Sequence, residues 1–257
     1  MSLSYSIYKM QTNNNTILIT GGATGIGFAL AEKFSKNGNT VIICGRRNDK
    51  LEEARKKCPE LHIKTTDINN PKDRIELKQW IISNFPDLNI LVNNAGIQKT
   101  FFIKQENTVE AITTEVMTNL VSPIHLTNLL VPYLTKQKEA AIINISSGLA
   151  FIPVAAMPVY CATKAALHSF TISIRHQLKD TSIKVFEIAP PIVETELGHD
   201  STRKDGKLEG IAPSQVADET FDAVRSNRFE LAIGMVQSLY DAVHSDKADF
   251  VFNRMNQ

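Results

Sequence analysis

Short apolar runs alternate along the chain with longer segments in which apolar residues recur at helical spacing. The runs are rich in β-branched residues, and they predict strands at 16–20, 40–44, 62–66, 89–92, 141–146, 183–188 and 230–233. The amphipathic segments predict helices at 25–36, 49–57, 71–84, 109–134, 158–179, 213–225 and 238–253. Runs such as ILIT and AIINI are nearly continuously apolar, as in parallel strands covered on both faces. The pattern predicts an α/β fold, a doubly wound parallel seven-stranded sheet with helices on both faces.

The chain is expected to form a single domain. Its 257 residues suit one sizeable α/β domain, and no linker, internal repeat or low-complexity tract interrupts them. Residues 1–14 are expected to be a flexible leader and residues 15–257 the domain itself. The polar, irregular residues 194–212 are expected to form a mobile loop that serves the substrate.

Composition narrows the classes of partner. The 28 basic and 27 acidic side chains nearly cancel, which gives no reason to expect a nucleic-acid partner. No apolar run approaches the roughly 18 residues of a membrane span, so no membrane partner is expected. Cys44, Cys58 and Cys161 cannot all pair and lack metal-ligand spacing, which predicts a cytoplasmic protein without a metal.

A glycine-rich turn, GGATGIG at 21–27, joins the first predicted strand to the first predicted helix. Glycines let a backbone approach a pyrophosphate, whose charge is stabilised by N–H groups at the helix N-terminus. The alternative is a turn with a purely structural role, but the strand–turn–helix order favours a Rossmann-type dinucleotide site. The residues expected to contact the dinucleotide are Gly21, Ala23, Thr24, Gly25, Ile26 and Gly27.

Two arginines follow the second predicted strand. An NAD site usually has a carboxylate near this place for the ribose 2′-hydroxyl, whereas this chain has Arg46 and Arg47. A guanidinium can grip a 2′-phosphate through two parallel hydrogen bonds. NADP(H) is therefore favoured over NAD(H), although both arginines also suit a solvated helix start.

Two more strand ends carry candidate coenzyme contacts. Asp67, with Ile68 beside it, ends the third strand, where its carboxylate would accept from an adenine amino group. The alternative is a plain N-cap or turn residue before the next helix. The small, turn-prone Asn94, Ala95 and Gly96 end the fourth strand, where backbone would approach the coenzyme ribose.

Candidate catalytic side chains lie around the fifth strand and the helix after it. Tyr160 and Lys164 are four residues apart and therefore share one helical face. An ammonium beside a phenol favours phenolate, so the pKa of Tyr160 is expected to fall from about 10. Ser147, at the end of the strand, would hydrogen-bond the same substrate oxygen, a set that suits reversible carbonyl reduction. Without the other motifs, a tyrosine and a lysine at this spacing are more often surface residues, an amphipathic tyrosine beside a lysine whose charged end reaches the solvent.

The ordered motifs TGGATGIG, NNAG and YCATK, with a serine thirteen residues before the tyrosine, resemble the short-chain dehydrogenase/reductase family over residues 15–235. Stretches such as SSGLAF and YCATKAALHSF are most similar to the DltE-like bacterial oxidoreductases. The resemblance implies that Tyr160 is the acid/base, that Lys164 binds the nicotinamide ribose and lowers the tyrosine pKa, and that Ser147 holds the substrate oxygen. It implies that Asn119 holds a water in a proton relay. Coenzyme contacts are implied at Pro190, Val193 and Thr195, the last two with the carboxamide.

The sequence departs from this family at two places. Pro191 stands where the family usually has glycine, which is expected to stiffen the loop beside the nicotinamide. The segment after Gly234 differs from the C-terminal tail that is common in the family. Contacts between subunits that the family makes through this tail are therefore not expected from the resemblance.

These observations predict an NADP(H)-dependent oxidoreductase that transfers a hydride between the nicotinamide and a small-molecule carbonyl or secondary alcohol. The alternative is a catalytically silent nucleotide-sensing or interaction protein on the same fold. Helices 109–134 and 158–179 correspond to those that pair in the family's dimers, so a homodimer or homotetramer is expected.

Overall fold

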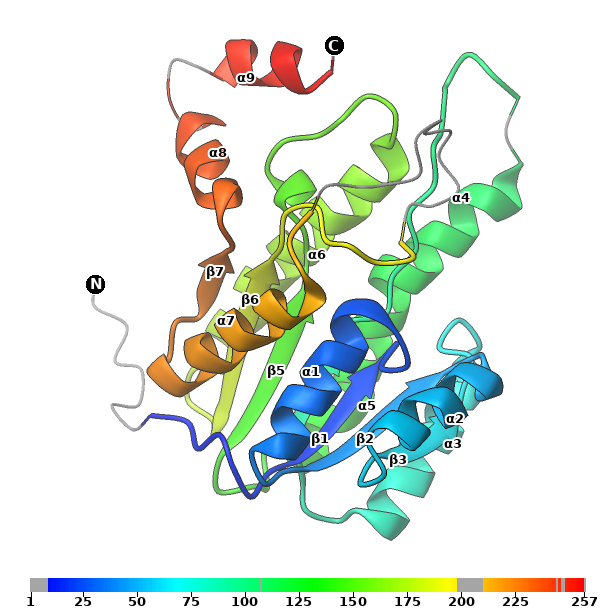
Figure 1. The fold of residues 1–257 in the computed structure, drawn as a ribbon, viewed down its shortest axis with the longest axis vertical. Coiled ribbons are helices and arrows are strands. Elements are labelled where there is room, and N and C mark those ends of the chain that lie inside the picture. The colour runs from blue at the N-terminus through cyan, green and yellow to red at the C-terminus, as the bar shows by residue number, and fades with distance from the viewer. Residues whose placement is uncertain (1–8, 107, 198–209, 244, 246–247, 257) are drawn as a thin grey trace.

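The structure is a computed structural model that describes residues 9–106, 108–197, 210–243, 245 and 248–256. Seven parallel strands form one sheet in the order β3-β2-β1-β4-β5-β6-β7 (Figure 1). The strands are β1 Thr16–Thr20, β2 Thr40–Gly45, β3 His62–Thr65, β4 Leu88–Asn93, β5 Ala140–Ile145, β6 Ile183–Ala189 and β7 Glu230–Ala232. The predicted doubly wound sheet is confirmed.

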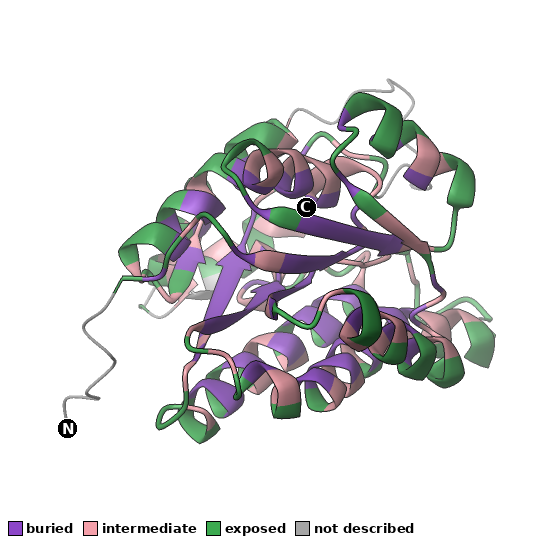
Figure 2. Cartoon of the chain, turned by 90° about the horizontal axis from the view of Figure 1, so that it is seen from below, coloured by how far each residue is buried: buried purple, intermediate pink, exposed green. Residues whose placement is uncertain are grey.

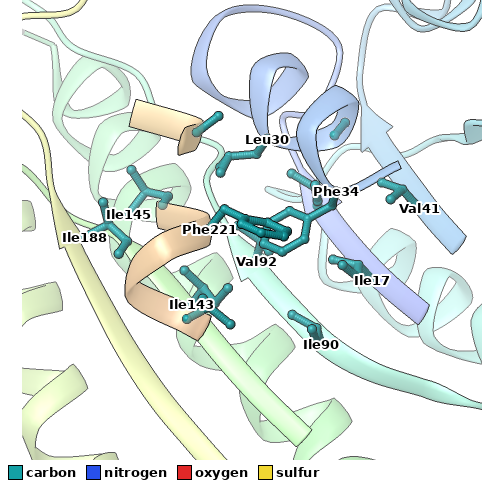
Figure 3. Close-up of a cluster of buried hydrophobic side chains, with 14 of the residues drawn as sticks. Ile17, Leu30, Phe34, Val41, Ile90, Val92, Ile143, Ile145, Ile188 and Phe221 are labelled. Atoms are coloured by element: carbon teal, nitrogen blue, oxygen red, sulfur yellow. The ribbon is translucent and has the colours of Figure 1, made fainter. Parts of the chain in front are cut away.

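Helices cover both faces of this sheet (Figure 2). The helices are α1 Gly25–Lys36, α2 Asn48–Lys57, α3 Pro71–Asn84, α4 Val109–Val116, α5 Ser122–Leu134, α6 Pro158–Gln177, α7 Pro213–Ser226, α8 Met235–Val243 and α9 Ala248–Met255. Buried side chains of α1, α2 and α7 pack on one face of the sheet, where Phe34 and Phe221 meet over the strands (Figure 3). Those of α3, α5 and α6 pack on the other face. Burial of both faces explains why most of the strand residues are apolar.

The expected single helix 109–134 is interrupted by a π-helical turn, η1 Met117–Val121, between α4 and α5. Proline at position 123 has no N–H to donate to the carbonyl of Asn119, and its ring would collide with that carbonyl in a regular α-helix. The backbone widens instead, and the N–H of Ser122 donates to the carbonyl of Met117. The other predicted helices up to residue 226, and the strands, differ from the observed ones only at their ends.

The two ends of the chain differ from expectation. The predicted helix 238–253 is two helices, α8 and α9, which lie beyond the carboxyl end of β7 (Figure 1). Within the expected leader, residues 1–8 lie outside the described residues, but Met10 is buried and its N–H donates to Asn227 Oδ1 at 3.3 Å. The end of the leader therefore packs on the domain. Of the expected mobile loop 194–212, residues 198–209 lie outside the described residues.

Candidate active site

The carboxyl ends of three adjacent strands bring the predicted site residues together. The glycine-rich turn follows β1, Asn94 to Gly96 follow β4, and Ser147 follows β5. In a parallel sheet these ends share one edge, where ligands bind in open α/β folds. A methyl group added at Gly96 would lie 3.4 Å from Asn119 Oδ1 and 3.7 Å from Lys164 Nζ. The predicted coenzyme turns therefore adjoin the predicted catalytic residues.

The glycine-rich turn is packed against the end of β4. Gly21 has φ +64°, and a Cβ on Gly27 would lie 2.2 Å from the Gly21 carbonyl oxygen, so both positions require glycine. The side chain of Asn94 donates to the carbonyls of Thr20 (3.0 Å) and Gly21 (3.2 Å). Asn94, predicted as a coenzyme contact, thus also fixes the shape of the turn.

The N-terminus of α1 fits a bound pyrophosphate. The N-cap residue Thr24 makes no side-chain capping bond, and the first turn of α1 carries no acidic residue. The N-terminal N–H groups of a helix need an acceptor. Gly25, with φ +54°, lets the chain enter α1 without a side chain in the way. These features match the dinucleotide predicted from the motif.

The two arginines after β2 differ in their surroundings. Arg47 Nη2 lies 3.0 Å from Glu196 Oε2 in the loop after β6, with both side chains more than half exposed. Arg46 is exposed and forms no ion pair with any residue that the structure describes. Of the two arginines, Arg47 is paired with a carboxylate among the described residues and Arg46 is not.

Asp67 occupies a turn before α3. Its Oδ1 accepts from the N–H of Asn69 at 3.0 Å, while Asn70 is the N-cap of α3. Asp67 is therefore not the N-cap but is the turn residue of the alternative interpretation, and its adenine contact stays a prediction. The neighbouring Ile68 is buried, and its carbonyl accepts from Ser122 Oγ at 2.6 Å and from Arg74. This fixes the loop in which the adenine contacts were predicted.

Ser147, Tyr160 and Lys164 are all buried at the end of β5. Lys164 Nζ donates to the carbonyl of Ile145 at 2.9 Å and lies 5.7 Å from the centroid of the Tyr160 ring. Ser147 Oγ accepts from the N–H of Leu149 at 3.1 Å and also hydrogen-bonds with the Tyr160 hydroxyl. Their burial excludes the alternative that Tyr160 and Lys164 are solvent-exposed surface residues.

Asn119 lies within the π-helical turn and is almost fully buried. Its Oδ1 accepts from the N–H of Ile97 at 2.9 Å, and its Nδ2 donates to the Ile97 carbonyl at 2.8 Å and to Thr163 Oγ1 at 3.1 Å. π-Helical turns often occur at functional sites. Asn119 therefore ties the chain beyond Gly96 to α6, beside Lys164.

Burial dominates the protonation of the two central groups. It raises the pKa of Tyr160 to about 12, against a smaller lowering by the hydrogen bond with Ser147. It lowers the pKa of Lys164 to about 8, against the Glu187 carboxylate, which raises it. The expected fall in the pKa of Tyr160 is therefore wrong for this structure, because desolvation of the buried phenol raises it. Tyr160 retains its proton at neutral pH.

The chain after β6 lies alongside the glycine-rich turn. The carbonyl of Pro190 accepts from the N–H of Gly148 at 3.0 Å, beside Ser147. Val193 forms a bridge with Ile211, and a Cβ on Gly25 would lie 3.0 Å from the Thr195 methyl group. These three predicted coenzyme contacts thus border both the catalytic residues and the glycine-rich turn.

Two polar side chains near the site, the buried Glu187 and the half-buried His168, were not predicted. Glu187 on β6 is 2% exposed, and its Oε2 lies 2.7 Å from Nδ1 of His168 on α6. A polar residue inside the apolar strand VFEIA, and a histidine one helical turn after Lys164, were the signals available in the sequence.

An apolar groove of about 910 Å³ lies apart from these side chains. It runs between α4, α6 and residues 101–104, and it is lined by Phe101, Phe102, Ile103, Lys104, Ile112, Val116, Leu120, Ala155, Pro158, Val159, Ala162, Thr163 and Ala166. Ser147, Tyr160 and Lys164 do not line it. The described residues contain no group of three histidine, cysteine or carboxylate side chains placed to hold a metal. None of their helices could cross a membrane.

Comparison with known proteins gives concordant matches. A family model described as short chain dehydrogenase matches residues 15–206. The uncharacterized oxidoreductase DltE of Bacillus subtilis (strain 168) is 45% identical over 250 residues, spanning 96% of this chain and 98% of that protein. The NADP-dependent 3-hydroxy acid dehydrogenase YdfG of Escherichia coli (strain K12) is 30% identical over 204 residues, spanning 78% and 82%.

A solved structure supports the fold. The crystal structure of a short chain dehydrogenase from Burkholderia cenocepacia J2315 in complex with NADP aligns with a TM-score of 0.83, over 96% of this chain and 100% of that chain. The two sequences are 23% identical, so this likeness bears on the fold alone.

Proposed function

This chain belongs to the short-chain dehydrogenase/reductase family and is an oxidoreductase, and from that premise we propose that it reduces a carbonyl group with NADPH or oxidises the corresponding alcohol. The observation that carries the proposal is the buried set of Ser147, Tyr160 and Lys164 beside the glycine-rich turn. The NADP-dependence of the relative YdfG supports the coenzyme. Its three cysteines are free thiols, which supports a location in the reducing cytoplasm.

When bound, NADPH supplies the hydride for the carbonyl carbon. Tyr160 donates its proton to the carbonyl oxygen as negative charge develops there, which its raised pKa permits throughout the neutral range. Ser147 orients the same oxygen through its hydroxyl. Lys164 binds the ribose and, with Asn119 and a water, returns a proton to Tyr160.

The test of the proposal is coenzyme consumption with a panel of ketones and aldehydes, run in parallel with NADPH and NADH. Oxidation of NADPH that depends on a carbonyl compound is the expected result. A protein that binds NADPH but consumes it with no member of a broad panel would contradict the proposal.

The first prediction concerns coenzyme choice. NADPH should bind at least about tenfold more tightly than NADH, a difference of about 1.4 kcal/mol, because Arg46 is free to grip the 2′-phosphate. Arg46→Asp should narrow or reverse this preference, measured by fluorescence titration. Arg47→Asp is the matched control, and its effect should be smaller because Arg47 already pairs with Glu196. Equal affinities in the unmutated protein would exclude the proposed role.

The second prediction concerns assembly. We propose that the apolar groove between α4 and α6 pairs with its copy in a homodimer, which would remove apolar surface from water. Sedimentation at micromolar concentration should show a species of at least twice the 28.6 kDa chain. Ile112→Asp, within the groove, should shift it toward monomer. Ile75→Asp, at an exposed position on α3, should not.

A further inference from the structure

Three polar side chains lie in register across β4, β5 and β6, on the face covered by α5 and α6. Asn93 is the register partner of Asn144, and Asn144 of Glu187. Asn93 Nδ2 donates to Asn144 Oδ1 at 2.8 Å and Asn144 Nδ2 donates to Thr171 Oγ1 at 2.9 Å, whereas Asn93 Oδ1 is buried without a partner among the described residues. Glu187 differs from both because it can carry a charge. The row thus places a carboxylate inside the core of the protein.

This carboxylate is only partly satisfied. Glu187 Oε2 lies 2.7 Å from His168 Nδ1, while Oε1 is buried and has no partner among the described residues. A buried carboxylate with unused hydrogen-bonding capacity is costly, and such a group in a native core calls for an explanation. Packing supplies none, because an apolar side chain of similar size would fill the same volume without that cost.

The group that gains from the charge is Lys164. It lies one helical turn before His168 on α6, and its Nζ binds the carbonyl of Ile145, the residue after Asn144. Lys164 is buried and makes no ion pair within 4.0 Å with any described residue. Desolvation lowers its pKa, and the opposing influence is the Glu187 carboxylate. An opposite charge in a dry environment favours the charged form of its neighbour.

We propose that Glu187, held in place by His168, is a positioning residue that keeps Lys164 charged in the dry floor of the active site. The pair is sheltered by aromatic rings, since Phe151 contacts the His168 ring at 4.9 Å and Tyr240 of α8 at 4.8 Å, both edge to face. Shelter from water strengthens the field of a buried charge. The inference rests on the proposed function of Lys164 as the residue that binds the ribose and supports Tyr160.

Other charges around the pair fix the direction of its pH dependence. The hydrogen bond with Glu187 raises the pKa of His168 above its usual value, against desolvation, which lowers it. Glu230 on β7 raises this pKa further, and Arg175 on α6 lowers it. Arg175 and Glu230 also bind each other. Protonated His168 offsets the charge of Glu187. As the pH rises through the pKa of His168, the imidazole loses its proton and its positive charge. The Glu187 carboxylate then acts on Lys164 without this offset, so Lys164 stays charged at a pH at which it would otherwise lose its proton.

The test measures the pKa of Lys164 directly, by NMR of ¹⁵N-lysine-labelled full-length protein, with Lys164→Arg to assign the signal. Glu187→Gln preserves shape and removes the charge, and it should lower this pKa by about one unit. The alkaline limb of the pH profile of kcat/KM should move to lower pH by the same amount. Glu230→Gln is the matched control on the neighbouring strand and should change the pKa of Lys164 far less, because Glu230 acts on His168 and not directly on Lys164.

A folded Glu187→Gln protein with an unchanged Lys164 pKa would overturn the inference and show that Glu187 has only a structural role. If Glu187→Gln does not fold, His168 provides the second test. His168→Asn keeps a donor near the place of Nδ1 and should preserve the Lys164 pKa. His168→Leu leaves the buried carboxylate without a donor, which favours its protonated, neutral form, so the pKa of Lys164 should fall. The NMR readout needs neither coenzyme nor substrate, so failure of the proposed carbonyl reduction would be distinguishable from failure of this pair.

Discussion

Tyr160→Phe is expected to lower kcat by about two to four orders of magnitude while folding and NADPH binding survive. Phenylalanine retains the ring and its packing on α6, but it removes the hydroxyl that lies beside Ser147. Because burial raises the pKa of this hydroxyl to about 12, the tyrosine carries its proton throughout the neutral range. The measurement is steady-state reduction of an accepted ketone, paired with fluorescence titration of NADPH.

Tyr133→Phe is the matched control for this experiment. Tyr133 belongs to α5, where Lys78 and Lys136 approach its ring, and it is not among the residues of the candidate site. Its loss of a hydroxyl should leave kcat unchanged. A Tyr160→Phe protein that turns over near the original rate would show that the tyrosine and lysine of α6 are structural and that the proposed roles are wrong.

Gly27→Ala is expected to have the largest effect on the coenzyme site. The added methyl group would lie 2.2 Å from the Gly21 carbonyl oxygen and 2.5 Å from Asn94 Nδ2, distances that no packed carbon tolerates. The glycine-rich turn must move away from β4, so NADPH affinity should fall by at least about tenfold, or about 1.4 kcal/mol. The free energy of unfolding should fall by about 1–3 kcal/mol, as for other overpacked sites.

Thermal unfolding and NADPH titration measure these two losses. Gly45→Ala is the control for stability, since a methyl group at the end of β2 would meet no atom within 4 Å. If Gly27→Ala unfolds at the original temperature and binds NADPH normally, then the close packing between this turn and β4 does not determine the site.

The sequence predicts the sheet because the strands are buried on both faces, so their apolar runs need no knowledge of the neighbouring elements. It likewise predicts the glycine-rich turn, since the requirement for glycine at Gly21 is local to the backbone. The widened turn at Asn119 was missed because the effect of Pro123 depends on the hydrogen bonds of a helix that continues past it.

Long-range environment explains the remaining misses. Helical spacing places Lys164 near Tyr160, but it does not reveal that both side chains are buried, and burial determines the direction of both pKa shifts. The contact between Glu187 and His168 joins β6 to α6 and depends on the register of the strands. Met10 packs near Asn227, more than two hundred positions along the chain, which no local pattern encodes.

The π-helical turn also sets the phase of the helical segment that contains it. One extra residue in a turn advances every later side chain by about 100° around the axis. Through this shift α4 borders the outer apolar groove, whereas α5 directs Leu126 and Leu130 onto the sheet. Deletion of one residue from η1 would rotate one half of this segment against the other, so the apolar stripe of α5 and the groove edge of α4 could no longer both face their partners.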